Sequence, residues 1–542
     1  MRTAAPSIRS RDVNRRTHVT ARSIFPGGSY DGGRSDLREF ADWSPLAGGP
    51  LSDSLGDLPQ LRARARDLAR NAPIATSAKQ TTVLGVVGSG LSLQPRIDRA
   101  FLKLDDAAAS AFEAQAQRLW WAFAYGTPCD IQRQQTFDIA TRTALASAWE
   151  NGDMFVVRRY VKRPRDVVGI KLQLIEADRC STPDGLDFDP RYADGVERDA
   201  AGEISAFHFS SQHPGERLFG QGFIRKWTRV PAFDAYGERN VLHVHNPVTE
   251  QRIGALRGIP ALAPAMRIFK QSDRYTNAEI MAAVVAAMFT VFVKKAPGGV
   301  GENTLSPLTT TGTATGDENV PSSQYRLDTG AIFELLEGQS IETANPGRPN
   351  ANFAPFLMAM LEQVGTSLCI PYEVLVRRFT ASYSASRAAI ELAWAAFKMM
   401  RSWFVDEYAQ PIYEWMLVDA ILTGKLAAPG FFTDPLVRLA YSSCEWVGPT
   451  APQIDPLKDV QAADARIKAQ LSTHQRETAL LTGQDWTDTI AQLGKEKEQM
   501  KGAGVTAEPV PPPLSAPAVP PVDNATGSDL ETAAPSPAGA PE

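Results

Sequence analysis

Apolar residues recur at intervals of three and four positions along residues 384–424. This spacing places them on one face of an amphipathic helix, and the series begins with Ile390, Trp394 and Phe397. Arg387 and Glu391 lie four residues apart on the opposite face, where they can form an ion pair. The pattern predicts a helix that is long for an ordinary globular core.

The ends of this helix carry recognisable signals. Ser382 or Ser384 can cap its N-terminus, and Gly424 can end it. Pro411 lies inside the apolar series, where it should kink or break the helix because it has no N–H to donate. A short polar and basic segment, residues 376–381, joins the helix directly. A long helix with an exposed basic loop at its end suggests a moving element of a molecular machine rather than a catalytic pocket.

A second apolar segment, residues 280–293, resembles a membrane span but is too short to cross about 30 Å of hydrocarbon. Acidic residues precede it, and Lys294 and Lys295 follow it. We therefore predict a buried helix over residues 260–292, with Pro260 in its first turn, and no membrane contact. A Gly-, Ser- and Thr-rich segment then precedes three expected short strands (325–327, 331–335 and 340–343) and a returning helix at 350–368.

The rest of the chain predicts a helix-rich α+β fold. Expected helices cover residues 58–82, 107–125, 136–149, 455–471 and 472–483, and expected strands cover 154–160, 170–175, 204–209 and 241–245. The last two helices begin at an Asp455–Pro456 cap and at Ser472 with Gln475. The N-terminal region and the Pro/Ala-rich acidic tail lack an apolar pattern, so both are expected to be disordered.

Composition limits the classes of function. The chain has 542 residues, 43% of them hydrophobic and 22% charged, with a formal net charge of −5. A large core is therefore possible, whereas the protein as a whole does not attract nucleic acid. The four cysteines are far apart and form no metal-binding motif, which favours free thiols in a reducing compartment.

Candidate catalytic motifs are weak. No G-x-x-x-x-G-K-[ST] phosphate loop occurs, so the chain is not expected to drive an ATP-dependent process itself. The glycine-rich residues 85–90 are better explained as a helix C-terminus. Glu150 and Asp153 are best explained as a solvated turn, and His243 and His245 as structural histidines on one strand face, since no third ligand is evident. The sequence thus predicts no catalytic, metal or cofactor site.

Several motifs together resemble the lambda family of phage portal proteins. C-I-P-Y-E-V-L (369–375) and S-Y-S-A-S-R (382–387) resemble that family's G-[VI]-P-Y-E and N-Y-S-S-x-R. Six more segments agree in the same order: W-E-N-G-D-M-F-V (149–156), L-I-E-A-D-R (174–179), D-G-V-E-R-D-A-A-G-E-I (194–204), V-L-H-V-H (241–245), R-G-I-P-A-L-A-P (257–264) and W-V-G-P-T-A-P-Q-I-D-P-L-K-D (446–459). Cys369 replaces a glycine of the family pattern, and Ala385 replaces a serine.

The resemblance implies a portal-protein fold with wing, stem, clip and crown regions. The expected order is a disordered basic arm (1–57), a wing (58–258), a first stem helix (259–293), a clip with an insertion (294–349), a second stem helix (350–369), a tunnel loop (370–383), a long kinked wing helix with a following strand (384–445), crown helices (446–501) and a disordered tail (502–542).

The resemblance also implies a function without catalysis. Portal proteins form a twelvefold ring at one capsid vertex of the virion, and double-stranded DNA is packaged and ejected through its channel. Expected partners are further copies of the chain, DNA of any sequence, the terminase large subunit, major capsid and scaffold proteins, and head–tail connector proteins. Assembly would take place in the host bacterial cytoplasm. The candidate DNA-channel residues are Arg377, Arg378, Thr380 and Tyr383, with Lys294 and Lys295 as weaker candidates.

Two other classes remain open from the residues alone. One is a different ring-forming virion component, such as a connector or baseplate protein. The other is an enzyme whose site is not visible in the sequence, which a deep pocket with clustered ionisable residues would favour.

Overall fold

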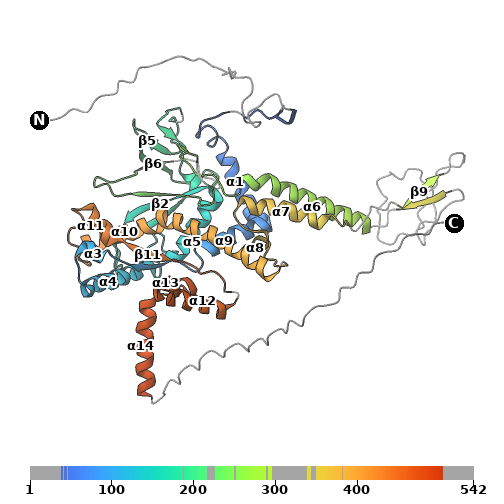
Figure 1. Ribbon diagram of the computed structural model, residues 1–542. Coiled ribbons are helices and arrows are strands. Elements are labelled where there is room, and N and C mark those ends of the chain that lie inside the picture. The colour runs from blue at the N-terminus through green and yellow to red at the C-terminus, as the bar shows by residue number, and fades with distance from the viewer. Residues whose placement is uncertain are drawn as a thin grey trace, which may run out of the picture. The chain divides into compact units, whose positions relative to one another are not determined.

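The structure is a computed structural model, and the part of it described here excludes both chain ends. The described residues are 38–40, 42–45, 47–186, 188–216, 226–249, 252–287, 291–295, 339–343, 350–380, 382–453 and 455–503. The chain divides into two compact units, Met1–Asp459 and Val460–Glu542 (Figure 1). Most of the arm expected at 1–57, the tail expected at 502–542 and the strands expected at 325–327 and 331–335 lie outside the described residues.

Four main helices form the N-terminal part of the first unit: α1 (Leu58–Asn71), α2 (Pro73–Val86), α4 (Asp106–Ala124) and α5 (Phe137–Asn151). The single helix expected over residues 58–82 is wrong, because the chain breaks at Ala72, which adopts an extended conformation. A residue before proline disfavours the helical region, and Pro73 follows. Residues 85–90 do end a helix: Gly88 adopts φ +60° and its N–H donates to the carbonyl of Val83.

Two antiparallel sheets follow these helices. The strands expected at 154–160, 170–175, 204–209 and 241–245 are confirmed, and several short strands join them. In the first sheet the order is β3 (Ile170–Glu176), β2 (Asp153–Tyr160), β8 (Val241–His245). In the second it is β4 (Tyr192–Ala193), β5 (Val196–Arg198), β6 (Ile204–Ser210), β7 (Trp227–Pro231). A separate two-stranded sheet pairs β1 (Ser92–Pro95) with β11 (Cys444–Val447). The shorter helical segments of the unit are η2 (Arg38–Phe40), α3 (Arg99–Leu102), η3 (Ala177–Arg179) and η4 (Ala263–Ala265).

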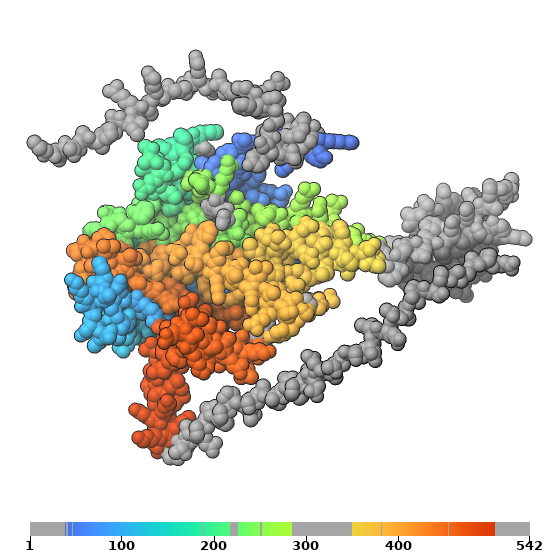
Figure 2. Space-filling view, viewed as in Figure 1, coloured from blue at the N-terminus to red at the C-terminus, as the bar shows by residue number. Residues whose placement is uncertain are grey.

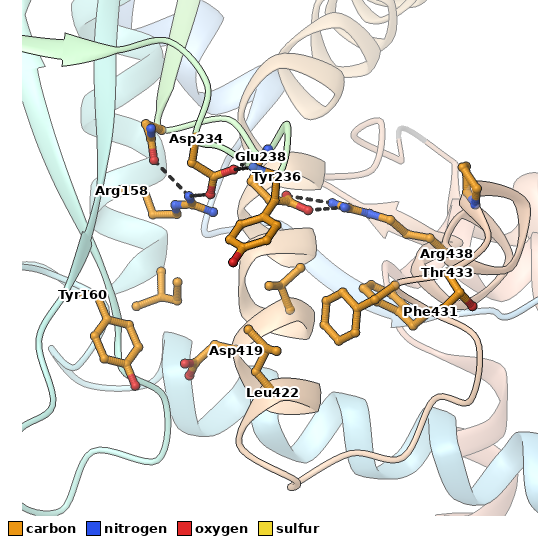
Figure 3. Close-up of a pocket in the computed structure, with 15 residues that line it drawn as sticks. Arg158, Tyr160, Asp234, Tyr236, Glu238, Asp419, Leu422, Phe431, Thr433 and Arg438 are labelled. Carbon is orange, nitrogen blue, oxygen red and sulfur yellow. Dashed lines mark hydrogen bonds and ion pairs between the residues drawn. The ribbon is translucent and has the colours of Figure 1, made fainter.

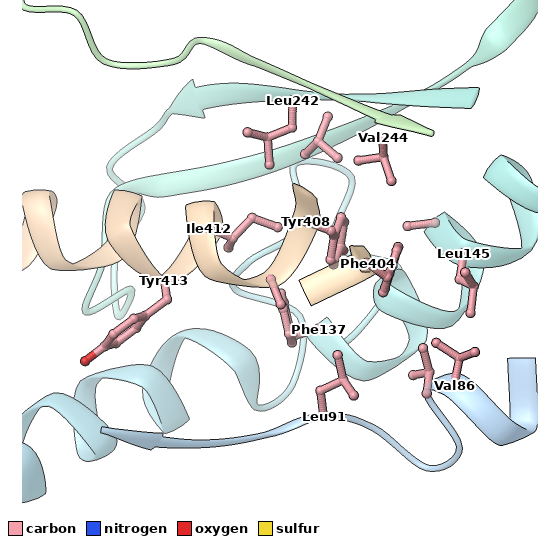
Figure 4. Packing of buried hydrophobic residues seen from close by; sticks show 14 of the residues in the cluster. Val86, Leu91, Phe137, Leu145, Leu242, Val244, Phe404, Tyr408, Ile412 and Tyr413 are labelled. Carbon is pink, nitrogen blue, oxygen red and sulfur yellow. The ribbon is translucent and has the colours of Figure 1, made fainter. Parts of the chain in front are cut away.

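The predicted long helix contributes many of the buried residues of the hydrophobic core. It consists of α9 (Tyr383–Phe404), a π-helical turn (Val405–Ala409) and α10 (Gln410–Leu422). Ser382 caps it by accepting a hydrogen bond from Ala385 N–H, and Gly424 follows its end with φ +68°. Figure 4 shows how Phe404, Tyr408 and Ile412 pack against the first sheet and α5. All three side chains are almost completely buried.

Pro411 does not break this helix. The N–H of Gln410 donates to the carbonyl of Val405, five residues earlier, so the helix widens by one residue just before the proline. A π-turn of this kind lets the chain continue although Pro411 has no N–H. An additional helix that periodicity did not predict, α11 (Pro435–Ser442), lies between α10 and β11.

The α6–α7 hairpin extends from the body of the first unit (Figure 1). Helix α6 (Met266–Ala287) is preceded by a short 3-10 turn, so the helix expected over residues 260–292 is too long at both ends. Residues 291–295 instead form strand β9 (Val291–Lys295), which pairs antiparallel with β10 (Gln339–Thr343). The returning helix is α7 (Phe353–Ser367). None of the described helices is long and apolar enough to cross a membrane.

The second unit is helical. It contains most of α12 (Pro456–Lys468), then α13 (His474–Thr482) and α14 (Trp486–Gly502). Arg466 holds Glu477 in a two-point ion pair, with N–O distances of 2.7 and 3.0 Å, which joins α12 to α13. The cap of α13 is Thr473 rather than the expected Ser472, because the hydroxyl of Thr473 accepts from Arg476 N–H. Periodicity did not predict α14 as a separate helix.

Candidate functional site

The basic segment before α9 is not a simple loop. It follows a short helix, α8 (Tyr372–Val376), which begins directly after Pro371. Leu375 of this helix is fully buried, as is Ile370 just before it. The expected tunnel loop over residues 370–383 is therefore a helical turn with a buried base, and only its last part lies exposed at the surface.

Arg377 has a left-handed backbone. It follows the last residue of α8 with φ +55°, and its N–H donates to the carbonyl of Glu373. The N–H of Arg378 donates to the same carbonyl at 3.0 Å. These bonds end the helix in the manner of a glycine cap, although residues other than glycine rarely adopt this conformation. The arrangement fixes the direction in which the backbone of both arginines leaves α8.

The predicted channel residues come together on this exposed turn. Arg377, Arg378 and Thr380 are exposed, and the side chain of Tyr383 is 53% exposed at the start of α9. Neither arginine has an ion-pair partner among the described residues. The turn therefore presents two uncompensated positive charges from a fixed position.

Contacts with neighbouring helices hold α8 in place. The hydroxyl of Ser77 on α2 donates to the carbonyl of Leu375 at 2.8 Å. Behind it, the carbonyl of Ile370 lies so close to Gly365 of α7 that a Cβ on that glycine would be only 2.5 Å away. Because α8 packs against α2, α7 and α9, the position of the two arginines is coupled to these three helices.

The weaker candidates lie in the strand pair beyond α6. Lys294 and Lys295 belong to β9, and their backbones pair with Ser340 and Gln339 of β10. Their side chains lie outside the described residues. Their role in the channel stays a prediction.

A group of buried charges surrounds Asp153, where the sequence suggested a solvated turn. That expectation is wrong for Asp153, whose side chain is fully buried at the start of β2. Arg257, also fully buried, donates to both of its carboxylate oxygens at 2.7 and 3.1 Å. Arg62 of α1 lies 3.3 Å away. Burial alone would raise the pKa of Asp153, but the two arginines and a hydrogen bond from His243 hold it well below its usual range. Glu150 is separate and pairs with Lys79 at 3.0 Å.

This charged group joins distant parts of the chain. Arg257 also donates to the carbonyls of Ala177 and Cys180 and to Asp194. It therefore connects the first sheet to the turn between β4 and β5 of the second sheet. The donors of this guanidinium are thus directed at protein acceptors from several segments.

His243 and His245 lie side by side on β8. Their rings lie 4.0 Å apart, and each meets a carboxylate: His243 meets Asp153 at 3.0 Å and His245 meets Glu407 of the π-turn at 3.2 Å. Burial and the neighbouring His245 lower the pKa of His243 from 6.5 to about 4. No group of three potential metal ligands occurs among the described residues.

Comparison with known proteins identifies the family. The model of the family "Phage portal protein, lambda family" matches residues 36–401. The chain belongs to this family. It is 25% identical over 493 residues to portal protein B of Escherichia phage lambda, covering 88% of this chain and 91% of that protein. It is likewise 25% identical over 510 residues to the portal protein of Escherichia phage N15, covering 87% and 93%.

Solved structures give more distant similarities. Two of them are chains from a native gene transfer agent particle, one from the virion and one from the neck computed with C12 symmetry. They are 11% and 12% identical with TM-scores of 0.42 and 0.41, and they cover 78% and 79% of this chain and 93% of each of those chains.

Family membership settles the class of function. The chain is a phage portal protein, a structural component of the virion at the portal of the capsid, and not an enzyme. Sequence reasoning located the α8 turn through its motif but missed Arg62 and Arg257 as buried residues. One signal could have indicated this pair: Asp153 and Arg257 each lie in a segment that resembles the family.

Proposed function

We propose that twelve copies of this portal protein form a ring around a channel for double-stranded DNA, as the family resemblance implies. In this ring the α8 turn faces the channel, and Arg377 and Arg378 contact the phosphate backbone without reading sequence. The observation that supports this most is a pair of exposed arginines, without an ion-pair partner among the described residues, on a turn whose base is buried.

Electrostatics favours few rather than many such contacts. Each cation that neutralises a phosphate releases counterions and adds to affinity, and these contributions sum over subunits. A duplex that must move cannot be held tightly by every copy. A chain with a net charge of −5 that presents two positive charges at one constriction can guide DNA and let it pass.

The α6–α7 hairpin supports contact between subunits. Its side chains were expected to be buried, yet Ile280, Met281 and Val284 of α6 are 54%, 62% and 43% exposed in the isolated chain. Phe356 and Met358 of α7 are 52% and 42% exposed, and α7 lies at the surface in Figure 2 (yellow). These apolar groups are exposed although α6 packs against α7, α1 and η4, and such a surface is typical of an interaction site. In the proposed ring this surface contacts the same hairpin of the next subunit.

The region names follow from this proposal. The unit that contains both sheets and α9–α10 would be the wing, the α6–α7 hairpin the stem, the β9–β10 pair part of the clip, and α12–α14 the crown. The terminase large subunit and head–tail connector proteins would dock at the clip, and capsid and scaffold proteins would contact the ring periphery.

The test removes both positive charges from the α8 turn. The double variant Arg377→Ala, Arg378→Ala should still form rings in negative-stain images, because neither side chain contributes to the buried base of the turn. Particles carrying it should retain less packaged DNA, by on the order of tenfold, since each subunit loses two phosphate contacts. Particles with intact rings and a normal DNA content would contradict the assignment of this turn to the channel.

A matched control is available on another surface. Lys103 and Arg118 are both exposed, and Lys103 has the same left-handed backbone as Arg377, with φ +53°. The variant Lys103→Ala, Arg118→Ala removes the same charge and should package DNA normally. An equal loss in both variants would show that net charge, and not the α8 turn, is responsible.

A further inference from the structure

A groove of about 980 Å³ lies in the first unit, away from the α8 turn. Figure 3 shows three walls: strand β2 with Arg158 and Tyr160, the β7–β8 turn around Tyr236, and the C-terminal end of α10 with the following segment around Phe431. Its volume is at the upper end of the range for ligand pockets. Portal function as described above does not use it.

The rim of this groove is aromatic and exposed. Tyr236 is 92% exposed, Leu422 69%, Tyr160 61% and Phe432 53%. Large apolar side chains gathered around one concavity are typical of a surface that binds a partner. The aromatic rings provide flat faces, which suit a ligand that stacks on them.

The charged groups of the groove are already satisfied. Arg158 pairs with Asp234 at 2.7 Å and also donates to Asn240, and Arg438 pairs with Glu238 at 2.9 Å. On the floor, Asp419 accepts from Gly169 N–H at 2.9 Å. No charge in the lining is left without a polar partner, so the groove fits an uncharged ligand better than an ionic one.

The same chain contains a segment with matching chemistry. Residues 505–522 read V-T-A-E-P-V-P-P-P-L-S-A-P-A-V-P-P-V and include a single charged residue, Glu508. Aromatic-lined grooves bind proline-rich segments, because such segments are restricted to an extended polyproline II conformation and lose little entropy on binding. We propose that the groove around Tyr236 and Phe432 binds the proline-rich segment 509–522 of the C-terminal tail.

Three features support this segment over other occupants. Residues 509–522 carry no charge, and the charged groups of the groove already have polar partners. It contains two clusters of prolines, 511–513 and 520–521, that can meet different rings of the rim. It also belongs to every copy of the chain and so is present wherever the groove is. The proposal does not depend on the DNA channel, and each can fail without the other.

The test uses the full chain with a photo-cross-linker in the groove. In Tyr236→p-benzoylphenylalanine, irradiation should attach the tail, and cleavage after glutamate should release the adduct with residues 499–531, because the Glu508–Pro509 bond resists such cleavage and Glu498 and Glu531 are the flanking sites. Replacing Pro511, Pro512, Pro513, Pro520 and Pro521 with serine in the same chain should lower the yield of this adduct by roughly tenfold, since serine neither stacks on the rings nor favours the extended conformation.

The control places the cross-linker on another exposed aromatic residue. Trp121 is 62% exposed and stacks on Tyr125, outside the groove. Trp121→p-benzoylphenylalanine should give no tail adduct. Three results would overturn the proposal: adducts from position 236 only to a different segment or a different protein, no adduct with the tail, or an equal tail adduct from position 121 that the serine replacements do not change.

Discussion

Replacing Arg257 with alanine tests whether the buried charges around Asp153 hold the two sheets together. The guanidinium of Arg257 is fully buried and donates to Asp153, to Asp194 and to the carbonyls of Ala177 and Cys180. The variant would leave Asp153 in the interior with only Arg62, His243 and the Gly258 N–H as donors. Removing one partner of a buried ion pair costs about 3–5 kcal/mol of unfolding free energy.

The assay is urea unfolding followed by tryptophan fluorescence, with amide hydrogen exchange of β2 and β6 as a local measure. Arg229→Ala is the matched control, because Arg229 also makes a two-point ion pair, with Glu197, but is 49% exposed at the side chain. Exposed pairs contribute roughly 0–1 kcal/mol. If Arg257→Ala lowers the unfolding free energy no more than Arg229→Ala does, the buried charges are not what joins the sheets.

A second substitution sharpens the result. In the double variant Arg257→Ala, Asp153→Asn, a neutral amide replaces the buried carboxylate, so no buried negative charge is left without the guanidinium. Its loss of stability should therefore be smaller than the sum of the two single losses, because residues in one ion-pair network do not contribute independently. Strict additivity would show that the two side chains are not coupled.

Two further predictions concern pH and backbone strain. The pKa of His243 falls from 6.5 to about 4 on folding, so the unfolded chain takes up the proton at a higher pH than the folded chain does. The unfolding free energy should therefore fall by up to about 3 kcal/mol between pH 6.5 and pH 4. Urea unfolding at several pH values in this range should show a weaker dependence of the unfolding free energy on pH for His243→Gln, and an unchanged pH dependence would contradict the burial of a neutral imidazole. Cys369 ends α7 with φ +57°, its N–H donating to Thr366 and the next N–H to Gly365, so Cys369→Gly should raise the melting temperature by relieving roughly 0.5–1 kcal/mol of strain. Cys369→Ala should not, and equal melting temperatures for the two variants would refute the strain.

Local signals in the sequence predicted much of the fold. The apolar period, Ser382 and Gly424 gave α9 and α10 with their ends, and the Arg387–Glu391 pair forms as expected, at 2.9 Å. Alternation gave the long strands of both sheets. The break that Pro411 could cause does not occur, because the helix widens by one residue just before the proline while Phe404 and Tyr408 are held in the core. Periodicity shows where a helix lies but not how its packing resolves a local conflict.

Local signals failed where partners are distant along the chain. Asp153 was expected in a solvated turn, yet its partners Arg62 and Arg257 are 91 and 104 residues away.

The sequence by itself determined the order of the main elements and, through eight motifs in one order, the family of the protein. Both depend on residues that are close in the chain or on their order along it. The tertiary structure alone decided which charges are buried, that Arg377 and Arg378 leave a fixed turn rather than a loose loop, and that Tyr236 and Phe432 border one groove. These features depend on which segments pack together, and a burial or an ion pair exists only once both sides of the contact are in place.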